Sequence, residues 1–329
     1  MKPLSHMLAC AMLTLFAAGC GGQAIAQAIA QAGGGTQGRI VAGNAPGGAT
    51  DIVARLLAPG FSAALGHNFV VDNRPGASGN IAAEFVAKAP ADGNTILLIF
   101  NSHTTIGPLF PKLPFDPIRD FAAVGLIAET PYMVVARPGL GVDNLRDLVA
   151  RAKRTREPIS AGSPGRGTPQ HLLFERVNKV HDIQINTIHY KGSAPAQIDV
   201  LGGHIDLTLV SPSLGGPLVR AGKLLALAVT SEARLADFPN VQTVRETGVD
   251  ALASTIWLGL LVPAKTPRAT VTQLNRILND TLKAPDTAAR LKAIGMTPVG
   301  GTPEAQDRTM AEEQAVWTTL IRDLKITID

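Results

Sequence analysis

Cysteine is almost absent from this 329-residue chain: its two cysteines, Cys10 and Cys20, both lie among the first 20 residues. The remaining sequence therefore offers neither a disulfide nor a thiol nucleophile. The seven histidines form no His-Glu-x-x-His motif and have no cysteine partner, so we expect no metal site. The Gly-x-Ser-x-Gly motif of serine hydrolases and the phosphate-binding P-loop are also missing. We therefore expect no catalytic residues, no cofactor and no enzymatic activity.

Aromatic residues make up only 4% of the chain, and no run of Lys and Arg is interleaved with them. Nucleic-acid-binding surfaces combine basic residues with aromatic ones, so nucleic acid is not an expected partner. The formal net charge is only +4. Such a mildly positive surface favours encounters with anions.

Long apolar runs are also lacking. Lys2, the apolar stretch 7–18 and the small residues that follow have the layout of a secretory signal peptide. This stretch is too short to span a bilayer, and no later segment reaches the roughly 20 residues that a membrane helix needs. We therefore expect a soluble mature protein outside the cytoplasm.

The end of this leader has two possible positions. Small-x-small cleavage sites occur at Ala24–Ala26 and Ala28–Ala30, each followed by Gln. Alternatively, Ala17–Cys20 has the form of a lipoprotein box, which would place a lipid anchor on Cys20. Residues 1–37 are accordingly assigned to a signal peptide and a Gly-rich, flexible lead-in.

Among the features that are present, the most informative is a glycine-rich loop at 44–51, between an apolar strand at 39–42 and an amphipathic helix. Glycine permits the turn, and Thr50 or Asp51 can cap the first turn of the helix. The free amides of such a loop and the positive end of the helix would attract an anion, for example a small carboxylate. The alternative, an ordinary strand-to-helix turn, stays open at this point.

Strand and helix patterns then alternate, which predicts parallel α/β layering. We expect strands at 68–71 and 95–100 and a helix at 81–89. Ligands of open α/β sheets bind beyond the carboxyl ends of strands, and the polar loop 101–105 follows such an end.

A second unit begins after a strand at 132–136 and a basic helix at 142–154. Residues 160–171 again indicate a strand, a Gly-rich turn and a helix start, with Thr168 placed as the cap. Further strands are expected at 186–190, 207–210, 224–230 and 258–262, and another polar loop, 211–216, follows the second of these. The chain should close with helices at 268–283, 287–294 and 304–324, and the apolar stripe that includes Trp317 indicates core packing.

Taken in order, these motifs resemble the Bug-type solute receptors, the periplasmic component of tripartite tricarboxylate transporters. The matching pieces run from about residue 39 to the C-terminus: Pro46–Gly48 with Asp51, Asn73–Ala77 with Gly79, Ala91–Gly93, Leu113–Pro117, Ser163–Gly165 with Gly167–Thr168 and His171–Leu172, Tyr190–Gly192 with Ala194–Ala196, Ala221–Lys223 with Ala226–Thr230, and Gly300–Pro303. Each piece alone is weak, but the ordered set is highly specific.

The resemblance implies a type II periplasmic-binding-protein fold, in which two α/β lobes joined by two crossing segments enclose a ligand cleft. It divides the chain into a first lobe at 38–136 plus 256–329 and a second lobe at 137–255. The crossings are expected near Ala136 and Ser254, with the closing helices returning to the first lobe.

The resemblance also implies how a ligand is held: by loop amides, hydroxyls and ordered water rather than mainly by a buried arginine. The candidate ligand-binding residues that follow from it are Gly47, Gly48, Ala49 and Ser102 in the first lobe, with Ser163, Gly165, Gly167, Thr168 and Ser211 in the second. Arg166 stands where many members of the family carry Asn. We hypothesise that it biases the site toward a ligand with a second carboxylate, and a solvent-facing Arg166 is the alternative.

We therefore expect a monomeric periplasmic receptor that captures a small carboxylate and delivers it to the membrane permease of a tripartite transporter. A protein that presents its ligand to the membrane kinase of a two-component system is the alternative. The identity of the carboxylate does not follow from the sequence.

Overall fold

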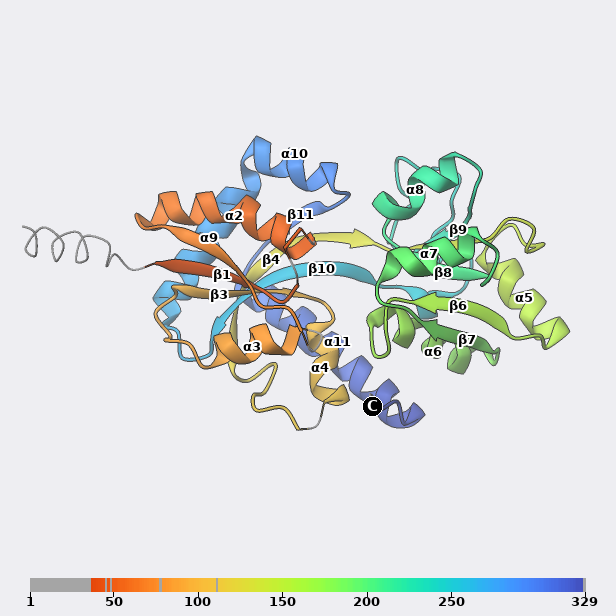
Figure 1. Cartoon of the computed structure of the whole chain (residues 1–329), viewed down its shortest axis with the longest axis horizontal. Helices are drawn as coiled ribbons and strands as arrows, with labels where there is room; N and C mark the ends of the chain where they lie inside the picture. The colour runs from red at the N-terminus through yellow and green to blue at the C-terminus, as the bar shows by residue number, and fades with distance from the viewer. Residues whose placement is uncertain (1–36, 45, 48, 77–78, 111, 328–329) are drawn as a thin grey trace, which may run out of the picture.

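The computed structural model describes residues 37–327 except positions 45, 48, 77, 78 and 111. The expected leader, Cys20 and Gly48 lie outside the described residues. The described chain forms two sheets, each covered by helices on both faces (Figure 1). Within these ranges, no helix combines the length and the apolar character needed to cross a lipid bilayer.

The larger sheet has six strands in the order β11-β4-β10-β3-β1-β2. β1, β2 and β3 are parallel, whereas β10 is antiparallel to both β3 and β4. Its strands are Gly38–Ala42 (β1), Phe69–Asn73 (β2), Thr95–Phe100 (β3), Phe121–Pro131 (β4), Thr255–Pro263 (β10) and Thr297–Gly300 (β11).

Helices cover both faces of this sheet because its central strands are apolar on both sides. Ile96 and Leu98 of β3 belong to the core beneath α2, α9 and α10, whereas Leu97 and Ile99 belong to the core beneath α3 and the first half of α11 (Figure 1). The helices are Ala49–Leu65 (α2), Asn80–Ala87 (α3), His103–Leu109 (α4), Arg268–Lys283 (α9), Pro285–Ala293 (α10) and Pro303–Leu324 (α11).

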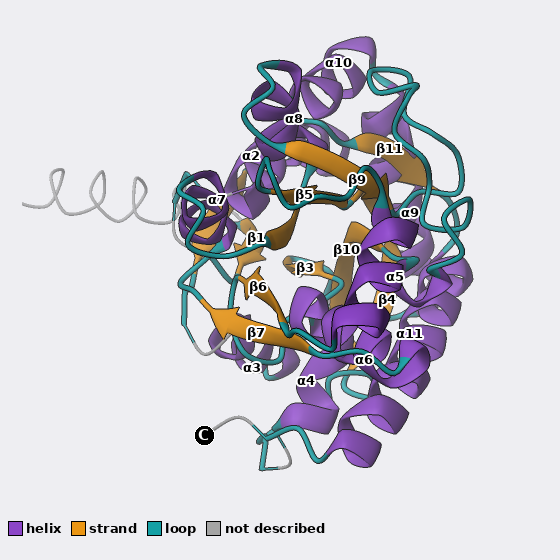
Figure 2. Cartoon of the chain, turned by 90° about the vertical axis from the view of Figure 1, so that its right-hand side faces the viewer, coloured by secondary structure: helices purple, strands orange, loops and turns teal. Residues whose placement is uncertain are grey.

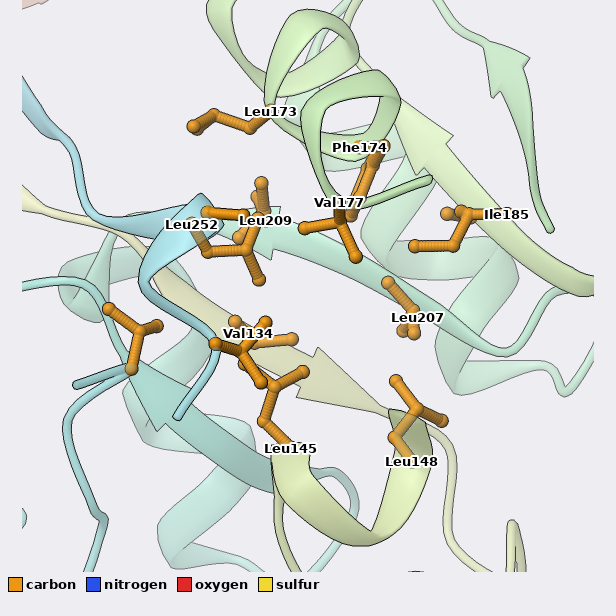
Figure 3. Packing of buried hydrophobic residues seen from close by; sticks show 14 of the residues in the cluster. Val134, Leu145, Leu148, Leu173, Phe174, Val177, Ile185, Leu207, Leu209 and Leu252 are labelled. Atoms are coloured by element: carbon orange, nitrogen blue, oxygen red, sulfur yellow. The ribbon is translucent and has the colours of Figure 1, made fainter. Parts of the chain in front are cut away.

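The smaller sheet has five strands in the order β7-β6-β8-β5-β9. Its strands are Met133–Ala136 (β5), Ile159–Ser163 (β6), Ile185–His189 (β7), Leu207–Val210 (β8) and Leu225–Val229 (β9). Figure 2 shows α7 (Ser193–Leu201) and α8 (Pro212–Arg220) on the opposite side of this sheet from α5 (Leu145–Thr155) and α6 (Pro169–His181). Figure 3 shows its main core, in which residues of β5 and β8 meet those of α5 and α6: Val134, Leu207 and Leu209 with Leu145, Leu148, Phe174 and Val177.

The chain passes between the sheets at two neighbouring points. Only Tyr132 separates β4 of the larger sheet from β5 of the smaller one, and the return lies between β9 and β10, where a short 3-10 helix covers Asp250–Leu252. The Tyr132 N–H donates to Thr230 Oγ1 at 2.8 Å, and the Thr230 N–H donates to the Tyr132 carbonyl at 2.9 Å. The Thr230 hydroxyl also donates to the Ser254 carbonyl, so the two crossings are hydrogen-bonded to each other.

The last helix, α11, belongs to both bodies of the molecule, where a body is one sheet with the helices that cover it. Met310 lies in the core of the larger sheet, whereas Trp317, Leu320 and Ile321 lie in the main core of the smaller one. Trp317 is therefore a core residue, as its position in the apolar stripe predicts. The closing helices were expected to return to the first lobe. α9, α10 and the first half of α11 do so, whereas the second half of α11 packs against the smaller sheet.

Two predicted loops are largely helical, and two strands were not predicted. The polar segments after β3 and β8 turn into helices almost at once, α4 at His103 and α8 at Pro212. Each of these helices contains an internal proline and two or more residues that favour loops, which hides it from a pattern search. β4 and β11 were missed because their alanines, glycines and prolines weaken the apolar signal of a strand.

Candidate functional site

Three helices of the larger body start where parallel strands end: α2 follows β1, α3 follows β2 and α4 follows β3. Because these strands are parallel, their carboxyl ends share one edge of the sheet, and the three helix starts are neighbours. They line a cavity of about 50 Å³. Its lining combines Gly43, Asn44, Thr50, Gly79, Ser102 and His103 with the apolar residues Ala83, Leu97, Leu98, Ile99, Phe100 and Ile106. Helix N-termini carry unpaired N–H groups and a partial positive charge, so this cavity favours an anion.

Thr50 contributes a buried hydroxyl to the lining of this cavity. It lies in the first turn of α2, is 2% exposed, and its Oγ1 has no hydrogen-bond partner among the described residues. A buried hydroxyl without a partner costs on the order of 1–3 kcal/mol, so a bound acceptor would stabilise this position. The sequence pattern predicts Thr50 only as a helix cap. Its place after a Gly-rich loop is the one sequence feature that could have indicated a role in ligand binding.

Asp51 stabilises the start of α2. Its Oδ2 accepts hydrogen bonds from the Gly47 N–H at 3.0 Å and from Arg55 Nε at 2.9 Å. The bonds from Arg55 and Gly47 hold the pKa of the Asp51 carboxyl below its usual range, so a negative charge lies at the positive end of the helix. The Gly47 amide, a predicted ligand donor, thus has a partner in the first turn of α2, and Ala49 is the first residue of that helix.

Ser102 lines the same cavity at the start of α4, and its hydroxyl does not cap the helix. The neighbouring His103 is buried and donates from Nε2 to the Pro117 carbonyl at 2.7 Å. Burial lowers the pKa of His103 to about 4, so the imidazole is neutral near pH 7. Ser102 therefore offers its hydroxyl to the cavity with no charged histidine beside it.

The smaller body repeats this arrangement. α6 follows β6, α7 follows β7 and α8 follows β8, and β6 is parallel to both β7 and β8. The Gly192 N–H at the start of α7 donates to the Pro164 carbonyl at 3.1 Å, which joins two of these helix starts. Figure 1 shows both sets of helix starts in the middle of the molecule, between the two sheets.

The loop between β6 and α6 is held by its own hydroxyls. The Gly165 carbonyl accepts hydrogen bonds from Ser163 Oγ at 3.2 Å and from Thr168 Oγ1 at 2.7 Å. Gly167, whose φ of +76° favours glycine, donates its N–H to His171 Nδ1 at 3.0 Å. Thr168 is the N-cap residue of α6 by position, but its side chain does not cap the helix. Three predicted ligand donors thus have partners inside this loop, and contact with a ligand stays a prediction for them.

Ser163 also lies 2.8 Å, Oγ to Nδ1, from His189, the last residue of β7. The His171 ring packs edge-on against His189, with 4.6 Å between centroids. Burial lowers the pKa of His171 to about 4, and burial and the Arg166 charge lower that of His189. Both rings are therefore neutral near pH 7.

The remaining predicted residues lie at the rim of the second cluster. Arg166 is exposed, and its Nη1 donates to the Thr327 carbonyl at 3.3 Å. Ser211 is the N-cap residue of α8, with its hydroxyl 2.9 Å from that of Ser213. The structure thus places the predicted residues in two clusters, one at the starts of α2 and α4 and one at the starts of α6 and α8.

Three contributors to these clusters were not predicted from the sequence: Thr50, His189 and the start of α3 at Gly79 and Asn80. A signal for α3 was available, since residues 73–81 repeat the strand, Gly-rich loop and helix pattern of residues 41–52. No sequence signal pointed to His189, because its proximity to Ser163 depends on the pairing of β6 with β7.

Two α/β bodies joined by crossing strands, with polar helix starts between them, define the class of two-lobed solute-binding proteins. The model of the family described as "Tripartite tricarboxylate transporter family receptor" matches residues 53–326. The chain belongs to this family of solute-binding receptors, the family that its ordered motifs predicted. This membership and the similar solved structures confirm the type II fold.

Relatives agree along nearly the whole length. Protein BugT of Bordetella pertussis is 34% identical over 280 residues, covering 84% of this chain and 86% of the relative. The structure of Rpa4515 from R. palustris with adipate is 33% identical with a TM-score of 0.75, covering 89% of this chain and 99% of the other. MatC from Rhodopseudomonas palustris with bound malate is 27% identical with a TM-score of 0.73, covering 87% of this chain and 99% of the other.

Proposed function

We propose that this protein is a receptor that captures a small carboxylate between its two bodies and delivers it to a tripartite membrane transporter. One observation carries the proposal: three helix starts meet at a cavity whose lining includes Thr50, a residue with a buried hydroxyl that has no partner among the described residues. Such a cavity provides hydrogen-bond donors and positive potential, and the histidine in its lining, His103, is neutral with Nε2 bonded to the Pro117 carbonyl. It is suited to holding an anion and not to transforming it.

The relatives support the chemistry of the ligand. Structures of two proteins of similar length and fold contain adipate and malate, both of which carry two carboxylates. Dehydrating a carboxylate costs several kcal/mol, and one hydrogen bond to a charged group returns about 1.5–3 kcal/mol. Several donors are therefore needed, and we propose that both clusters supply them: Thr50, Ala49 and Ser102 from the larger body, and the starts of α6 and α8 from the smaller one.

Three further assignments belong to the same proposal. We infer lobe limits of 38–136 plus 256–329 and 137–255, corrected in that β5 (Met133–Ala136) and the second half of α11 pack with the smaller body. We also infer that a signal peptide within residues 1–37 directs the chain to the periplasm, with cleavage after a small residue or lipidation of Cys20. We infer that the mature receptor is a monomer without enzymatic activity. Long incubation with a bound acid, followed by mass spectrometry, should return the acid unchanged.

The direct test is a thermal-shift panel of mono-, di- and tricarboxylates, acidic amino acids and aromatic acids, followed by calorimetry of the acids that raise the melting temperature. Thr50→Val should weaken binding of those acids about 10-fold to 100-fold, because it removes one hydrogen bond to a charged group. A panel without any shift, or a Thr50→Val variant that binds as tightly as wild type, would contradict the proposal.

Thr266→Val is the matched control. Thr266 is also buried, at 6% exposure, with a hydroxyl that has no partner among the described residues. It follows β10, which is antiparallel to β3, so it lies at the edge of the sheet opposite to the cavity. Its replacement should leave the affinity unchanged.

A further inference from the structure

A cluster of polar side chains at the ends of β6 and β7 has no part in the cavity described above. It consists of Ser163, Arg166, His171 and His189. Ser163 and His189 are paired residues of the two parallel strands, and Ser163 Oγ lies 2.8 Å from His189 Nδ1. The side chains of this cluster therefore have fixed partners within the protein.

The hydrogen bonds determine where the protons lie. His171 Nδ1 accepts the Gly167 N–H, so the proton of the neutral His171 ring is on Nε2. The Ser163 hydroxyl donates to the Gly165 carbonyl, so His189 Nδ1 acts as the donor to Ser163 Oγ. His189 Nε2 is then an acceptor without a partner among the described residues, and protonation would convert it into a cationic donor.

The charges around His189 come from two elements. Arg166, in the loop before α6, is exposed and has no ion-pair partner within the described part of the chain. From α6, His171 faces His189, and Glu175 Oε1 lies 3.7 Å from His171 Nε2. β6 contributes no charged residue. Without a bound anion, burial lowers the pKa of His189, and the charge of Arg166 lowers it further because it opposes protonation.

We propose that Arg166 and His189 form a second, proton-linked subsite for the distal carboxylate of a dicarboxylate. The proposal rests on the proposed function, in which the cavity at Thr50 holds the first carboxylate. A second carboxylate beside Arg166 offsets the guanidinium charge and favours protonated His189, so binding takes up a proton. His189 is here a specificity-determining residue that separates dicarboxylates from monocarboxylates.

The first experiment needs no carboxylate. NMR titration of the histidine side chains in the mature protein should give a higher pKa for His189 in Arg166→Gln than in wild type, by on the order of 0.5 pH unit or more. His204, an exposed histidine after α7, serves as the internal control and should not shift. An unchanged His189 pKa in Arg166→Gln would overturn the proposal, whichever acid the receptor binds.

The second experiment measures binding by calorimetry between pH 6.5 and 8.0 with two matched pairs of probes, adipate against hexanoate and malate against 2-hydroxybutyrate. For each dicarboxylate that binds, the affinity should fall several-fold as the pH rises over this range. Because one proton is taken up, the fall is at most about tenfold per pH unit. Affinity for the monocarboxylates should stay flat, and a binding heat that depends on the buffer should report proton uptake for the dicarboxylates alone.

His189→Asn is the decisive variant, because an Asn side chain can still donate to Ser163 Oγ but does not titrate. It should remove the pH dependence and leave monocarboxylate binding unchanged, whereas His204→Gln should behave as wild type. Equal pH dependence in wild type and His189→Asn would overturn the proposal. Failure of all four acids to bind would count against the proposed function instead, and the NMR experiment would still decide whether Arg166 and His189 form one site.

Discussion

Among single residues, Glu313 of α11 is the carboxylate with the most unusual environment. Its Oε1 accepts from Trp257 Nε1 at 2.9 Å, and its Oε2 lies 3.1 Å from Thr104 Oγ1, which also donates to the Asn101 carbonyl at 2.7 Å. Burial raises the pKa of the Glu313 carboxyl to about 7. A protonated Glu313 can donate to the Thr104 oxygen, which satisfies all these groups at once.

This environment predicts a defined pH dependence of stability. Between about pH 4.5 and 7, the folded protein keeps a proton on Glu313 that the unfolded chain has released, so the contribution of this group to the free energy of unfolding falls as the pH rises. The loss is at most about 3 kcal/mol. Glu313→Gln, which keeps an acceptor for Trp257 and a donor for Thr104, should be more stable than wild type at pH 8 and equal to it at pH 4.5.

Urea unfolding of both proteins at several pH values would test this prediction. The difference in the free energy of unfolding between the two proteins isolates the contribution of Glu313. The buried His103 and His171 contribute equally to both proteins, and their lowered pKa values reduce stability as the pH falls, not as it rises. A difference between Glu313→Gln and wild type that does not change with pH would contradict it.

At the scale of elements, the close approach of two loops shapes the cavity. A Cβ on Gly43, just after β1, would lie 2.9 Å from the Cα of Gly79 at the start of α3. Gly43→Ala should therefore push the two helix starts apart, lower the free energy of unfolding by about 1–3 kcal/mol and weaken carboxylate binding. Gly165→Ala is a suitable control for stability, because its Cβ would meet its nearest neighbour, Thr168 Cγ2, at an ordinary 3.6 Å. Equal stabilities of the two variants in urea unfolding would show that this approach is not tight.

The sequence predicted elements well where their pattern is local. β3 and α9 were predicted with the bounds that the structure has, since one is a continuous apolar run and the other a strongly amphipathic helix. Thr50 and His189 could not be recognised as site residues, because the cavity needs three helix starts brought together and the His189 contact needs two strands paired. The order of motifs identified the family, whereas the hydrogen bonds that occupy Gly47, Gly167 and Thr168 emerge only from the folded loops.

At the scale of the whole molecule, the two bodies meet on opposite sides of the crossing strands. On one side α11 contributes to both cores, and Lys179 of α6 pairs with Asp323 of α11 at 2.7 Å. On the other side α10 and α8 approach each other (Figure 1), and Ser213 at the start of α8 touches Gly295 after α10. Since α11 packs in the cores of both bodies, separation of the bodies should begin at the Ser213 and Gly295 contact.

This contact can be tested with a matched pair of glycine variants. A Cβ on Gly295, which has φ +78°, would lie 2.8 Å from Ser213 Cβ, whereas Gly248 has φ +76° and nothing within 4 Å of its Cβ position. Both alanine variants carry the same backbone strain, so only Gly295→Ala should also force the bodies apart. Small-angle scattering should give a larger radius of gyration for Gly295→Ala alone. Its affinity for a carboxylate should fall about fivefold for each kcal/mol by which the closed state is destabilised. Adding Ser213→Gly should restore both properties, and identical scattering from Gly295→Ala and Gly248→Ala would show that this contact does not govern closure.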